Sequence, residues 1–472
     1  MQFDSLTFLL FFGCVLIAYN AFSSWNVRKW VLLLASYLFY SAWNPSFLLL
    51  LLGSTTLDWW IARRISAAPT PVARRYWVVA TLLINLCVLG YFKYGRFVLD
   101  NLIVILARIG IDYSPPAFDI VLPIGISFYT FHSLSYCLDV YRGKFSPTQS
   151  WRDYALYVGF FPQLVAGPIT RFSQMREQIE TPRYTTAQNL GMGLSLLVFG
   201  LFEKQVLADT VFAPVADATF NAVTPITAAS AWAGVWAFSG QIFCDFAGYS
   251  TCALGVALTL GFVLPINFRN PYAALGFSDF WRRWHISLSS WLRDYLYVSL
   301  GGNRDGAWRT FRNLMLTMLI GGFWHGAAWT FVIWGGLHGL LLCTERIVAS
   351  VWMSRWNTRW ARAAYGVFTL VCVCLAWVWF RAGDLATGWH VTTQLFDLKD
   401  ALASLPDLTI DGRIALAVFA LLVMVQWLFR ERSPAWVFER LPVPLLGLLL
   451  GGLLTLIVFS PGDNHAFIYF QF

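Results

Sequence analysis

Apolar residues run almost without interruption along this chain, and the polar loops between the runs are short. In a bilayer core only helices and closed barrels satisfy every backbone polar group, and a helix needs about 20 apolar residues to cross it. Of the 472 residues, 58% are hydrophobic and 12% are charged, whereas soluble domains carry roughly 25% charged residues. We therefore expect an all-α polytopic membrane protein with about ten to twelve transmembrane helices, plus re-entrant or interfacial helices. The apolar runs cover residues 5–22, 30–43, 46–61, 76–92, 97–109, 118–138, 155–168, 189–207, 229–244, 251–266, 310–343, 363–380, 414–429 and 443–460.

This composition excludes several classes of protein. A soluble chain of this length needs far more charged side chains to cover its surface. A secreted enzyme, a disordered chain and a nucleic-acid-binding domain are therefore excluded, and the expected surroundings are membrane lipids, with no nucleic-acid partner. No internal repeat or separable soluble domain is visible, so we predict a single integral membrane domain over residues 1–472. The first apolar run is predicted to be a retained span, because no basic segment precedes it.

The loops between the runs differ in the sign of their charge, and this difference predicts an orientation. Segment 63–75 carries four arginines and no acid, and segment 344–362 carries four arginines and one glutamate. Segment 383–412 instead carries five aspartates and one lysine. Because Lys and Arg accumulate in cytoplasmic loops, we place the two basic segments and residues 430–440 in the cytoplasm, and 383–412 outside. This order places both chain termini on the outer, periplasmic side.

One apolar run differs from the others in its helix-breaking residues. Residues 160–168 include two prolines and a glycine within nine positions. Proline interrupts the hydrogen bonds of a helix interior, and membrane proteins tolerate such interruptions where the backbone is buried in protein. The pattern predicts a broken or re-entrant helix there.

The chain has six histidines, and a histidine within an apolar matrix needs a specific reason to be there. His285 lies in a segment that we predict to be one continuous helix through residues 281–295, with Ser278 as its N-cap. Helical spacing places Trp281 and His285 on one apolar stripe and most of the nearby arginines on the other side. The imidazole is therefore expected to point inward, with the arginine-rich face at the cytoplasmic boundary.

His325 follows two small residues, Gly321 and Gly322. If this segment is helical, the glycines and Ala328 share its face and leave a groove through which a substrate approaches the ring. A buried imidazole stays neutral and can accept a proton from a hydroxyl as a general base. Small residues at this spacing also let membrane helices pack closely, with the histidine hydrogen-bonded across the interface, and spacing alone does not separate the two. His338, 13 positions further on, is predicted to be a structural polar contact.

Asp245 and the adjacent pair Glu203 and Lys204 are further polar groups inside apolar runs. An unpaired carboxylate in a bilayer costs several kcal/mol. We expect Asp245 to be neutralised by an arginine, a histidine or backbone donors, in a scaffold role. No metal-ligand motif, phosphate-binding loop or nicotinamide fingerprint is found, so no metal and no bound cofactor are predicted.

Five segments of the chain resemble the membrane-bound O-acyltransferase family. Within that family, the string Trp-Arg-Arg-Trp-His-Ile-Ser-Leu-Ser and the segment Leu300–Arg304 are similar to the branch that O-acetylates alginate. The resemblance is most specific over residues 155–342. Its five segments are Phe161–Ile169, Asp245–Ser250, Leu264–Phe268, Trp281–Tyr297 and Trp324–Trp329.

The resemblance implies a fold of many helices around a tunnel open to both sides of the membrane. It also implies that His325 is the catalytic residue and that His285 is its partner in the tunnel. In this mechanism His325 removes a proton from an acceptor hydroxyl as the hydroxyl attacks an acyl thioester delivered from the cytoplasm. Nearby N–H or indole donors would stabilise the oxyanion. The residues expected to line the tunnel are Trp324, Gly322, Trp281, Trp284 and Asp245.

The last residues, Phe467–Phe472, resemble a terminal aromatic motif of the cell-envelope branch of this family. The resemblance makes Tyr469 an acyl-accepting relay to an acceptor on the outer face. The predicted orientation independently places this tail, residues 461–472, in the periplasm. The alternative is an aromatic anchor at the lipid boundary, a role that Tyr and Phe fill without chemistry.

The expected activity is that of a bacterial inner-membrane acyltransferase. It would pass an acetyl group from cytoplasmic acetyl-CoA across the membrane for O-acetylation of an exported polysaccharide, and a periplasmic acetyltransferase partner would complete the transfer. An alternative within the family is transfer of D-alanine from a carrier protein to teichoic acid. An alternative from another class is a transporter of polymer or lipid-linked sugar that catalyses no reaction.

Overall fold

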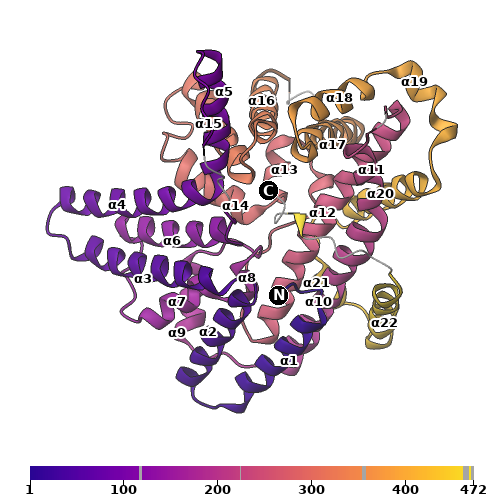
Figure 1. The fold of residues 1–472 in the computed structure, drawn as a ribbon. Coiled ribbons are helices and arrows are strands. Elements are labelled where there is room, and N and C mark those ends of the chain that lie inside the picture. The colour runs from indigo at the N-terminus through magenta and orange to yellow at the C-terminus, as the bar shows by residue number, and fades with distance from the viewer. Residues whose placement is uncertain (116–119, 224, 353–357, 461–466, 469–472) are drawn as a thin grey trace. The chain divides into compact units, whose positions relative to one another are not determined.

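The computed structural model describes residues 1–472 except 116–119, 224, 353–357, 461–466 and 469–472. Every regular element that we name in the described ranges is a helix, of the α, 3-10 or π type (Figure 1). The predicted all-α polytopic class is confirmed.

Seven helices in the described residues are long and apolar enough to cross a membrane, judged by length and composition. Two shorter apolar helices, Leu6–Ala21 and Val443–Phe459, accompany them. The number is below ten because some apolar runs join into one long helix and others are divided among short helices. The seven are Pro45–Ala67, Pro71–Arg108, Ala187–Phe220, Ala228–Thr259, Trp329–Val348, Arg359–Arg381 and Ile410–Leu428.

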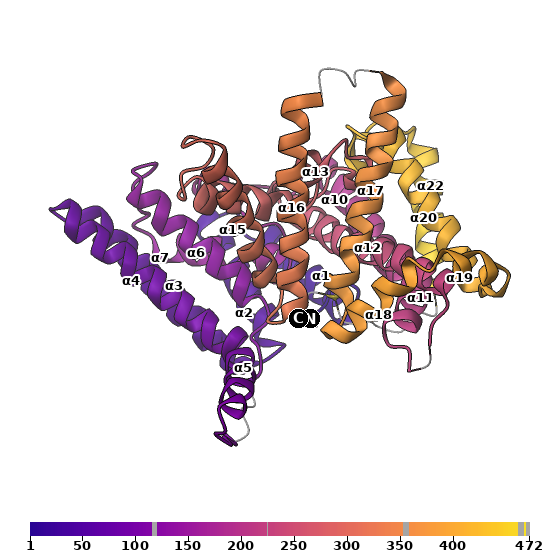
Figure 2. The same ribbon diagram turned by 90° about the horizontal axis from the view of Figure 1, so that it is seen from above.

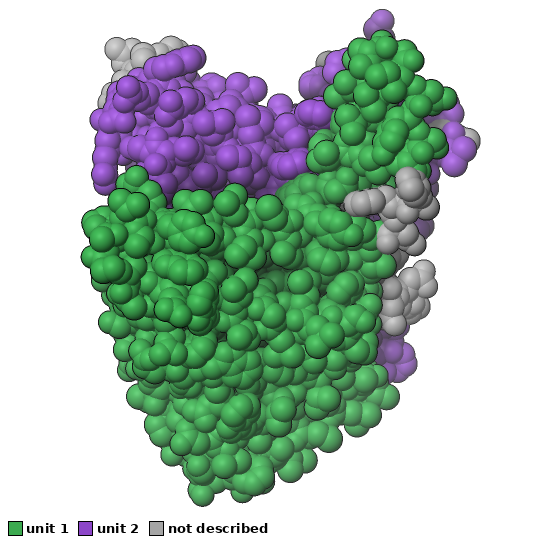
Figure 3. All heavy atoms as spheres, turned by 60° about the vertical axis from the view of Figure 1, so that its left-hand side comes forward, with its two compact units in different colours: residues 1–193, 256–265 green, residues 194–255, 266–472 purple. Residues whose placement is uncertain are grey.

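The chain divides into two compact units, which Figure 3 shows in different colours. Unit 1 consists of residues 1–193 and 256–265, and unit 2 consists of residues 194–255 and 266–472. Helices α10 (Ala187–Leu201) and α12 (Ala228–Thr259) each contain residues of both units. The single domain over residues 1–472 remains a prediction from the sequence.

Unit 1 contains the first nine α-helices. In Figure 2, α3, α4 and α6 lie side by side, and α2 packs on α7. Two of its long helices begin with a side-chain cap followed by proline, a combination that favours a helix start. Asn44 accepts a backbone N–H of α3 at 2.9 Å, and Thr70 accepts one of α4 at 3.1 Å. The elements of unit 1 are α1 (Leu6–Ala21), α2 (Trp25–Ser41), α3 (Pro45–Ala67), α4 (Pro71–Leu89), η1 (Gly90–Tyr94), α5 (Gly95–Arg108), α6 (Ile126–Tyr141), α7 (Trp151–Gly159), α8 (Phe161–Leu164) and α9 (Phe172–Glu180).

The broken helix predicted at residues 160–168 is confirmed, because α7 ends at Gly159 and α8 lasts only four residues. The buried Gln163 side chain supplies hydrogen bonds that a helix would otherwise make. Its amide N–H donates to the Tyr157 carbonyl at 2.6 Å, and its amide oxygen accepts from the Thr170 hydroxyl at 2.7 Å.

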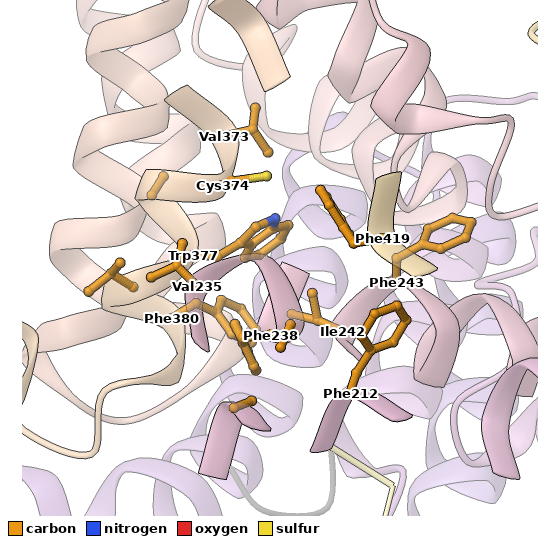
Figure 4. Close-up of a cluster of buried hydrophobic side chains, with 14 of the residues drawn as sticks. Phe212, Val235, Phe238, Ile242, Phe243, Val373, Cys374, Trp377, Phe380 and Phe419 are labelled. Carbon is orange, nitrogen blue, oxygen red and sulfur yellow. The ribbon is translucent and has the colours of Figure 1, made fainter. Parts of the chain in front are cut away.

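Unit 2 is organised around a large cluster of buried apolar side chains. Figure 4 shows Phe238 and Ile242 of α12 close to Trp377 and Phe380 of α17, with Phe419 of α20 beside them. The remaining elements of unit 2 are η2 (Phe202–Phe212), α11 (Ala213–Phe220), η3 (Pro271–Ala273), α13 (Phe277–Arg283), α14 (Ile286–Trp291), η4 (Leu292–Tyr297), α15 (Ala307–His325), α16 (Trp329–Trp352), α17 (Arg359–Arg381), α18 (Leu385–Leu395), α19 (Leu398–Ala403), η6 (Leu405–Asp407), α20 (Ile410–Leu428), α21 (Pro434–Phe438) and α22 (Val443–Phe459).

The apolar run 310–343 is two helices, α15 and α16, which turn back on each other after Gly326. Gly326 has an extended backbone, with φ −157°, and a Cβ atom there would overlap the Phe331 ring. The two helices then pack closely through glycines. A Cβ on Gly322 would lie 2.9 Å from the Cα of Gly335. Small residues are required wherever two helix backbones come this close.

Candidate active site

Two buried histidine rings lie close together in unit 2. His325 is the last residue of α15, and His285 lies between α13 and α14. Their ring centroids are 6.3 Å apart, and the two residues are 4% and 0% exposed. The structure therefore brings together the two histidines that the sequence singled out from segments 40 positions apart.

The prediction of one continuous helix through residues 281–295 is wrong. The helix stops after Arg283, and His285 has left-handed backbone angles, with φ 41° and ψ 53°. A loop at residues 267–269 forms hydrogen bonds with the backbone groups that would have continued the helix. Arg269 N–H donates to the Arg283 carbonyl at 2.9 Å, and Ile286 N–H donates to the Asn267 carbonyl at 2.8 Å. A left-handed non-glycine residue is strained, so this loop holds His285 in a costly conformation.

Ser278 is also not the N-cap of the preceding helix. Gly276 occupies the N-cap position of α13. The backbone N–H and the hydroxyl of Ser278 both donate to the Glu345 carboxylate, at 2.7 and 2.6 Å. A carboxylate from a distant helix therefore takes the contact that the sequence assigned to local capping.

Asn267 fixes the tautomer and the orientation of His285. Its side-chain oxygen accepts the Ser287 backbone N–H at 3.3 Å and the Ser287 hydroxyl at 2.6 Å. Because a backbone N–H can only donate, this atom is the amide oxygen, and the His285 Nδ1 atom at 3.3 Å must donate to it. His285 therefore carries its proton on Nδ1 and keeps Nε2 as the basic nitrogen.

Burial controls the charge of His285. The residue lies outside the seven candidate spans and is fully buried, and burial lowers its pKa from 6.5 to about 3. The ring is therefore neutral at pH 7. The Phe246 ring, edge-on at 4.6 Å, covers part of it.

Aromatic rings surround His325. The centroids of Trp324, Trp334 and Phe380 lie 4.9, 5.1 and 5.4 Å from the His325 ring. Trp334 is 1% exposed, and no described residue accepts a hydrogen bond from its indole N–H. A buried indole usually finds such an acceptor, so this donor is free to bind an oxygen atom of a substrate.

The glycine face beside His325 differs from the open groove that the sequence suggested. Gly322 faces the backbone of α16, and a Cβ on Gly321 would lie 3.1 Å from Leu292 Cδ1. Ala328 lies beyond the end of α15, so its placement on the His325 face was wrong. The structure supports the alternative in which the small residues at Gly322 allow two helices to pack.

The Trp334 ring contacts both His338 and His325. The His338 ring lies 4.9 Å from Trp334 and 5.1 Å from Trp281, and it stacks on Phe280 at 5.9 Å. The residue is fully buried, and no described residue forms a hydrogen bond with either ring nitrogen. The expected polar contact is thus a set of ring contacts. Trp284, another predicted tunnel residue, also stacks on Phe280, at 5.6 Å.

Asp245 belongs to a buried network of charges. Lys204 lies 2.6 Å from Asp245 and 2.8 Å from Asp209, so the cation is a lysine and not the expected arginine or histidine. The expected backbone donor is present, since the Ile468 N–H donates to Asp245 at 2.9 Å. Phe467 packs on Phe246, with centroids 5.9 Å apart, and Phe246 contacts His285. The residues that precede Tyr469 are thereby anchored near the histidines.

Tyr469 itself lies outside the described residues. The sequence did not predict the roles of Asn267, Trp334 or Lys204. Asn267 lies in Leu264–Phe268, one of the five segments that resemble the family, and this position could have indicated a role for it. The chain has 24 tryptophans, and no sequence pattern distinguishes the one whose indole faces a histidine.

Comparisons with known proteins match the region that holds these residues. The family model described as the membrane-bound O-acyltransferase family matches residues 147–382, which include His285 and His325. The probable alginate O-acetylase AlgI of Pseudomonas aeruginosa is 42% identical over 398 residues, covering 84% of this chain and 75% of that protein.

Two further relatives are named for other polymers, peptidoglycan and teichoic acid. The peptidoglycan O-acetyltransferase of Helicobacter pylori is 36% identical over 394 residues, covering 78% of this chain and 73% of that protein. The teichoic acid D-alanyltransferase of Streptococcus thermophilus is 28% identical over 251 residues, covering 50% of this chain and 58% of that protein. All three names describe transfer of an acyl group to a polymer.

Proposed function

Since this chain belongs to the membrane-bound O-acyltransferase family, we propose that it passes an acetyl group from cytoplasmic acetyl-CoA across the bacterial inner membrane to an exported polysaccharide. It is a multi-pass membrane O-acyltransferase. The relatives named alginate O-acetylase favour acetate as the acyl group and an alginate-type polymer as the acceptor. The donor, the direction of transfer and the periplasmic placement of both termini are part of the proposal.

The observation that carries this proposal is the buried pair of histidines. Their rings are 6.3 Å apart, and His285 is neutral with its basic nitrogen set by Asn267. His325, the general base of this proposal, must be shielded from competing water. The aromatic rings around His325 supply that shielding.

The proposed chemistry needs no group beyond the substrates. His325 removes the proton of the acceptor hydroxyl while the hydroxyl oxygen bonds to the thioester carbonyl carbon. The carbon–sulfur bond then breaks, and the CoA thiolate leaves with the proton that His325 returns. The free indole N–H of Trp334, beside His325, donates to the oxyanion that forms between these events.

Tyr469 is proposed as the acceptor of the first transfer. Ile468 and Phe467, the residues just before it, are held by Asp245 and Phe246 beside His285. The phenol would carry the acetyl group as an ester until a periplasmic acetyltransferase partner, or the polysaccharide itself, removes it. The anchored pair supports this relay, because Phe467 packs on Phe246, and Phe246 contacts His285.

The test uses the full-length protein in proteoliposomes with radiolabelled acetyl-CoA. His325→Ala is expected to lower acetyl transfer by about 10²- to 10⁴-fold, the usual contribution of a general base. The control is His390→Ala, an exposed histidine of α18. Transfer at the normal rate by a stably inserted His325→Ala variant would contradict the catalytic assignment.

The same assay separates the alternatives. An enzyme that uses only a carrier-bound D-alanyl thioester would instead be a teichoic acid D-alanyltransferase. A transporter would leave the thioester intact. An acetyl adduct on Tyr469, detected by mass spectrometry and lost in Tyr469→Phe, would support the relay, and normal transfer by Tyr469→Phe would refute it.

A further inference from the structure

A charged pocket of about 420 Å³ opens in unit 2 beside α13 and α16. Its volume lies within the range of roughly 300–1,000 Å³ that is common for small-molecule sites. Arg282, Arg346 and Arg430 line it together with Asp279 and Glu345, and leucines form its apolar wall. We call it the arginine pocket.

Most charges around the arginine pocket are already paired. Asp279 lies 2.6 Å from Arg430 and 3.0 Å from Arg283. Glu431 lies 2.6 Å from Arg283 and 2.8 Å from Arg430. Two arginines and two acids therefore balance each other at this edge of the pocket.

Two arginines remain without an acidic partner. In the part of the chain that the structure describes, no carboxylate lies within ion-pair distance of Arg282 or Arg346. The other acid of the pocket, Glu345, accepts hydrogen bonds from Ser278 and from the Tyr365 hydroxyl, the latter at 2.8 Å. Even with Glu345 counted as an anion, the pocket wall carries excess positive charge. Guanidinium groups in this state bind phosphate well, because their fork of donors matches phosphate oxygens.

The arginine pocket adjoins the histidine site through one short helix. On α13, Arg282 lines the pocket, while its neighbour Trp281 contacts Trp334 at 5.8 Å. Trp334 in turn contacts His325 at 5.1 Å. Helices α13 and α16 lie side by side (Figures 1 and 2). A series of contacts through α13 and α16 therefore connects the wall of the arginine pocket with His325.

The charge pattern of the loops also places the pocket on the donor side. Arg346 belongs to the basic segment 344–362 and Arg430 belongs to the basic segment 430–440. The positive-inside rule assigns both segments to the cytoplasm. Two segments that are far apart in sequence, assigned independently to one side, meet at this pocket.

We infer that the arginine pocket binds the phosphate of a phosphopantetheine thioester, with Arg282 and Arg346 as the phosphate ligands. This inference rests on the proposed function and specifies how that site takes its donor. Phosphopantetheine occurs both in CoA and on acyl carrier proteins, so the experiment must separate these two sources. CoA carries two further phosphate groups, which gives it more charge to engage the two arginines.

The test measures binding to the purified full-length protein by calorimetry. The probes are CoA, 3′-dephospho-CoA and pantetheine, which lacks phosphate. The double variant Arg282→Ala/Arg346→Ala is expected to bind CoA at least about tenfold more weakly, the effect of losing charge-assisted hydrogen bonds. It should bind pantetheine as the unsubstituted protein does. The matched control is Arg309→Ala, an exposed arginine at the start of α15 that pairs with Asp305; its affinity for CoA should not change.

Two further arms complete the design. Arg282→Lys/Arg346→Lys keeps the charge and should recover part of the affinity for CoA, which also shows that the loss does not come from misfolding. A carrier protein with its phosphopantetheine arm is compared with the same carrier without the arm. In one outcome, the protein binds no CoA but binds the carrier only when the carrier has its arm, and the alanine variant binds that carrier more weakly. This outcome would identify the carrier as the source of the phosphopantetheine and would retain the pocket assignment. Equal affinity of the unsubstituted protein and the alanine variant for both CoA and the carrier would overturn the inference.

The outcomes for the pocket and for the proposed function are distinguishable. If CoA binds through the two arginines but no acetyl group is transferred, the pocket assignment stands and the proposed acetyl transfer fails. If acetyl transfer occurs and the alanine variant keeps the normal KM for acetyl-CoA, the proposed function stands and the pocket assignment fails.

Discussion

Replacing Asn267 by alanine tests whether His285 acts in the orientation that the structure shows. The Asn267 side-chain oxygen accepts three donors, the Ser287 hydroxyl at 2.6 Å and the Ser287 N–H and His285 Nδ1–H at 3.3 Å each. The first distance is short and the other two are long for hydrogen bonds. The net loss of stability is therefore about 2–3 kcal/mol, dominated by the hydroxyl bond. The Asn267 carbonyl still accepts the Ile286 N–H, so the loop itself should persist.

The expected effect on activity follows from the lost restraint on the ring. Without its Nδ1–H acceptor, His285 can rotate and can move its proton to Nε2, so it no longer supports the general base His325 in the orientation that the structure shows. We expect acetyl transfer to fall by about 10- to 100-fold, equivalent to about 1.4–2.8 kcal/mol in the barrier. The measurement is the initial rate of transfer from radiolabelled acetyl-CoA in proteoliposomes, normalised to inserted protein, with the thermal unfolding midpoint recorded beside it.

Asn267→Asp is the informative companion variant. A carboxylate keeps the acceptor and adds a negative charge beside His285, which raises a histidine pKa by about 1–3 units. The pKa of His285 would rise from about 3 to roughly 4–6, so activity should fall between pH 6 and 5, where the unsubstituted enzyme stays active. An Asn267→Ala enzyme with an unchanged rate, or an Asn267→Asp enzyme with an unchanged pH profile, would refute the role assigned to this contact.

Three further predictions concern the charges and rings around the site. Lys204→Met removes the cation that lies between the buried carboxylates of Asp245 and Asp209 and should destabilise the protein by about 3–5 kcal/mol, seen as a lower unfolding midpoint that the added change Asp245→Asn partly restores. The unfolded chain protonates His285 below pH 6.5, whereas the folded protein does so only near pH 3. Stability should therefore fall as the pH drops from 6.5 toward 3, and the unfolding midpoint of His285→Gln should depend less on pH. Trp334→Phe keeps the ring but removes the indole donor, so acetyl transfer should fall by about 10²- to 10³-fold, with unchanged binding of CoA; a normal rate would exclude Trp334 as the oxyanion donor.

Much of the site could be identified from the sequence because its residues lie in recognisable strings. His285 and His325 were singled out as polar groups in an apolar matrix, and the motif resemblance, which the family match confirms, joined them. The end of the helix before His285 was not predictable, because it depends on hydrogen bonds between the helix backbone and a loop at residues 267–269. Helical periodicity reports only local preference, and a distant partner can override it.

The same distinction applies to Asp245 and to Ser278. The sequence showed that Asp245 needed a partner, but not that the partner is Lys204 on η2. Ser278 has the composition of an N-cap, and only the position of Glu345 on α16 gives it another role. Where a side chain has two possible hydrogen-bond partners, the fold decides which of them lies within hydrogen-bond distance.

The sequence by itself determined that this protein is helical, that it spans a membrane several times, and which histidines are the candidates for its chemistry. These properties depend on hydropathy and on short motifs, which involve only residues that are close together in the sequence. Only the tertiary structure decided that His285 is left-handed and bound to Asn267, that Trp334 faces His325, and that unpaired arginines gather beside α13. These arrangements join residues far apart in sequence, and their energies exist only after burial has removed the water that would otherwise satisfy each group.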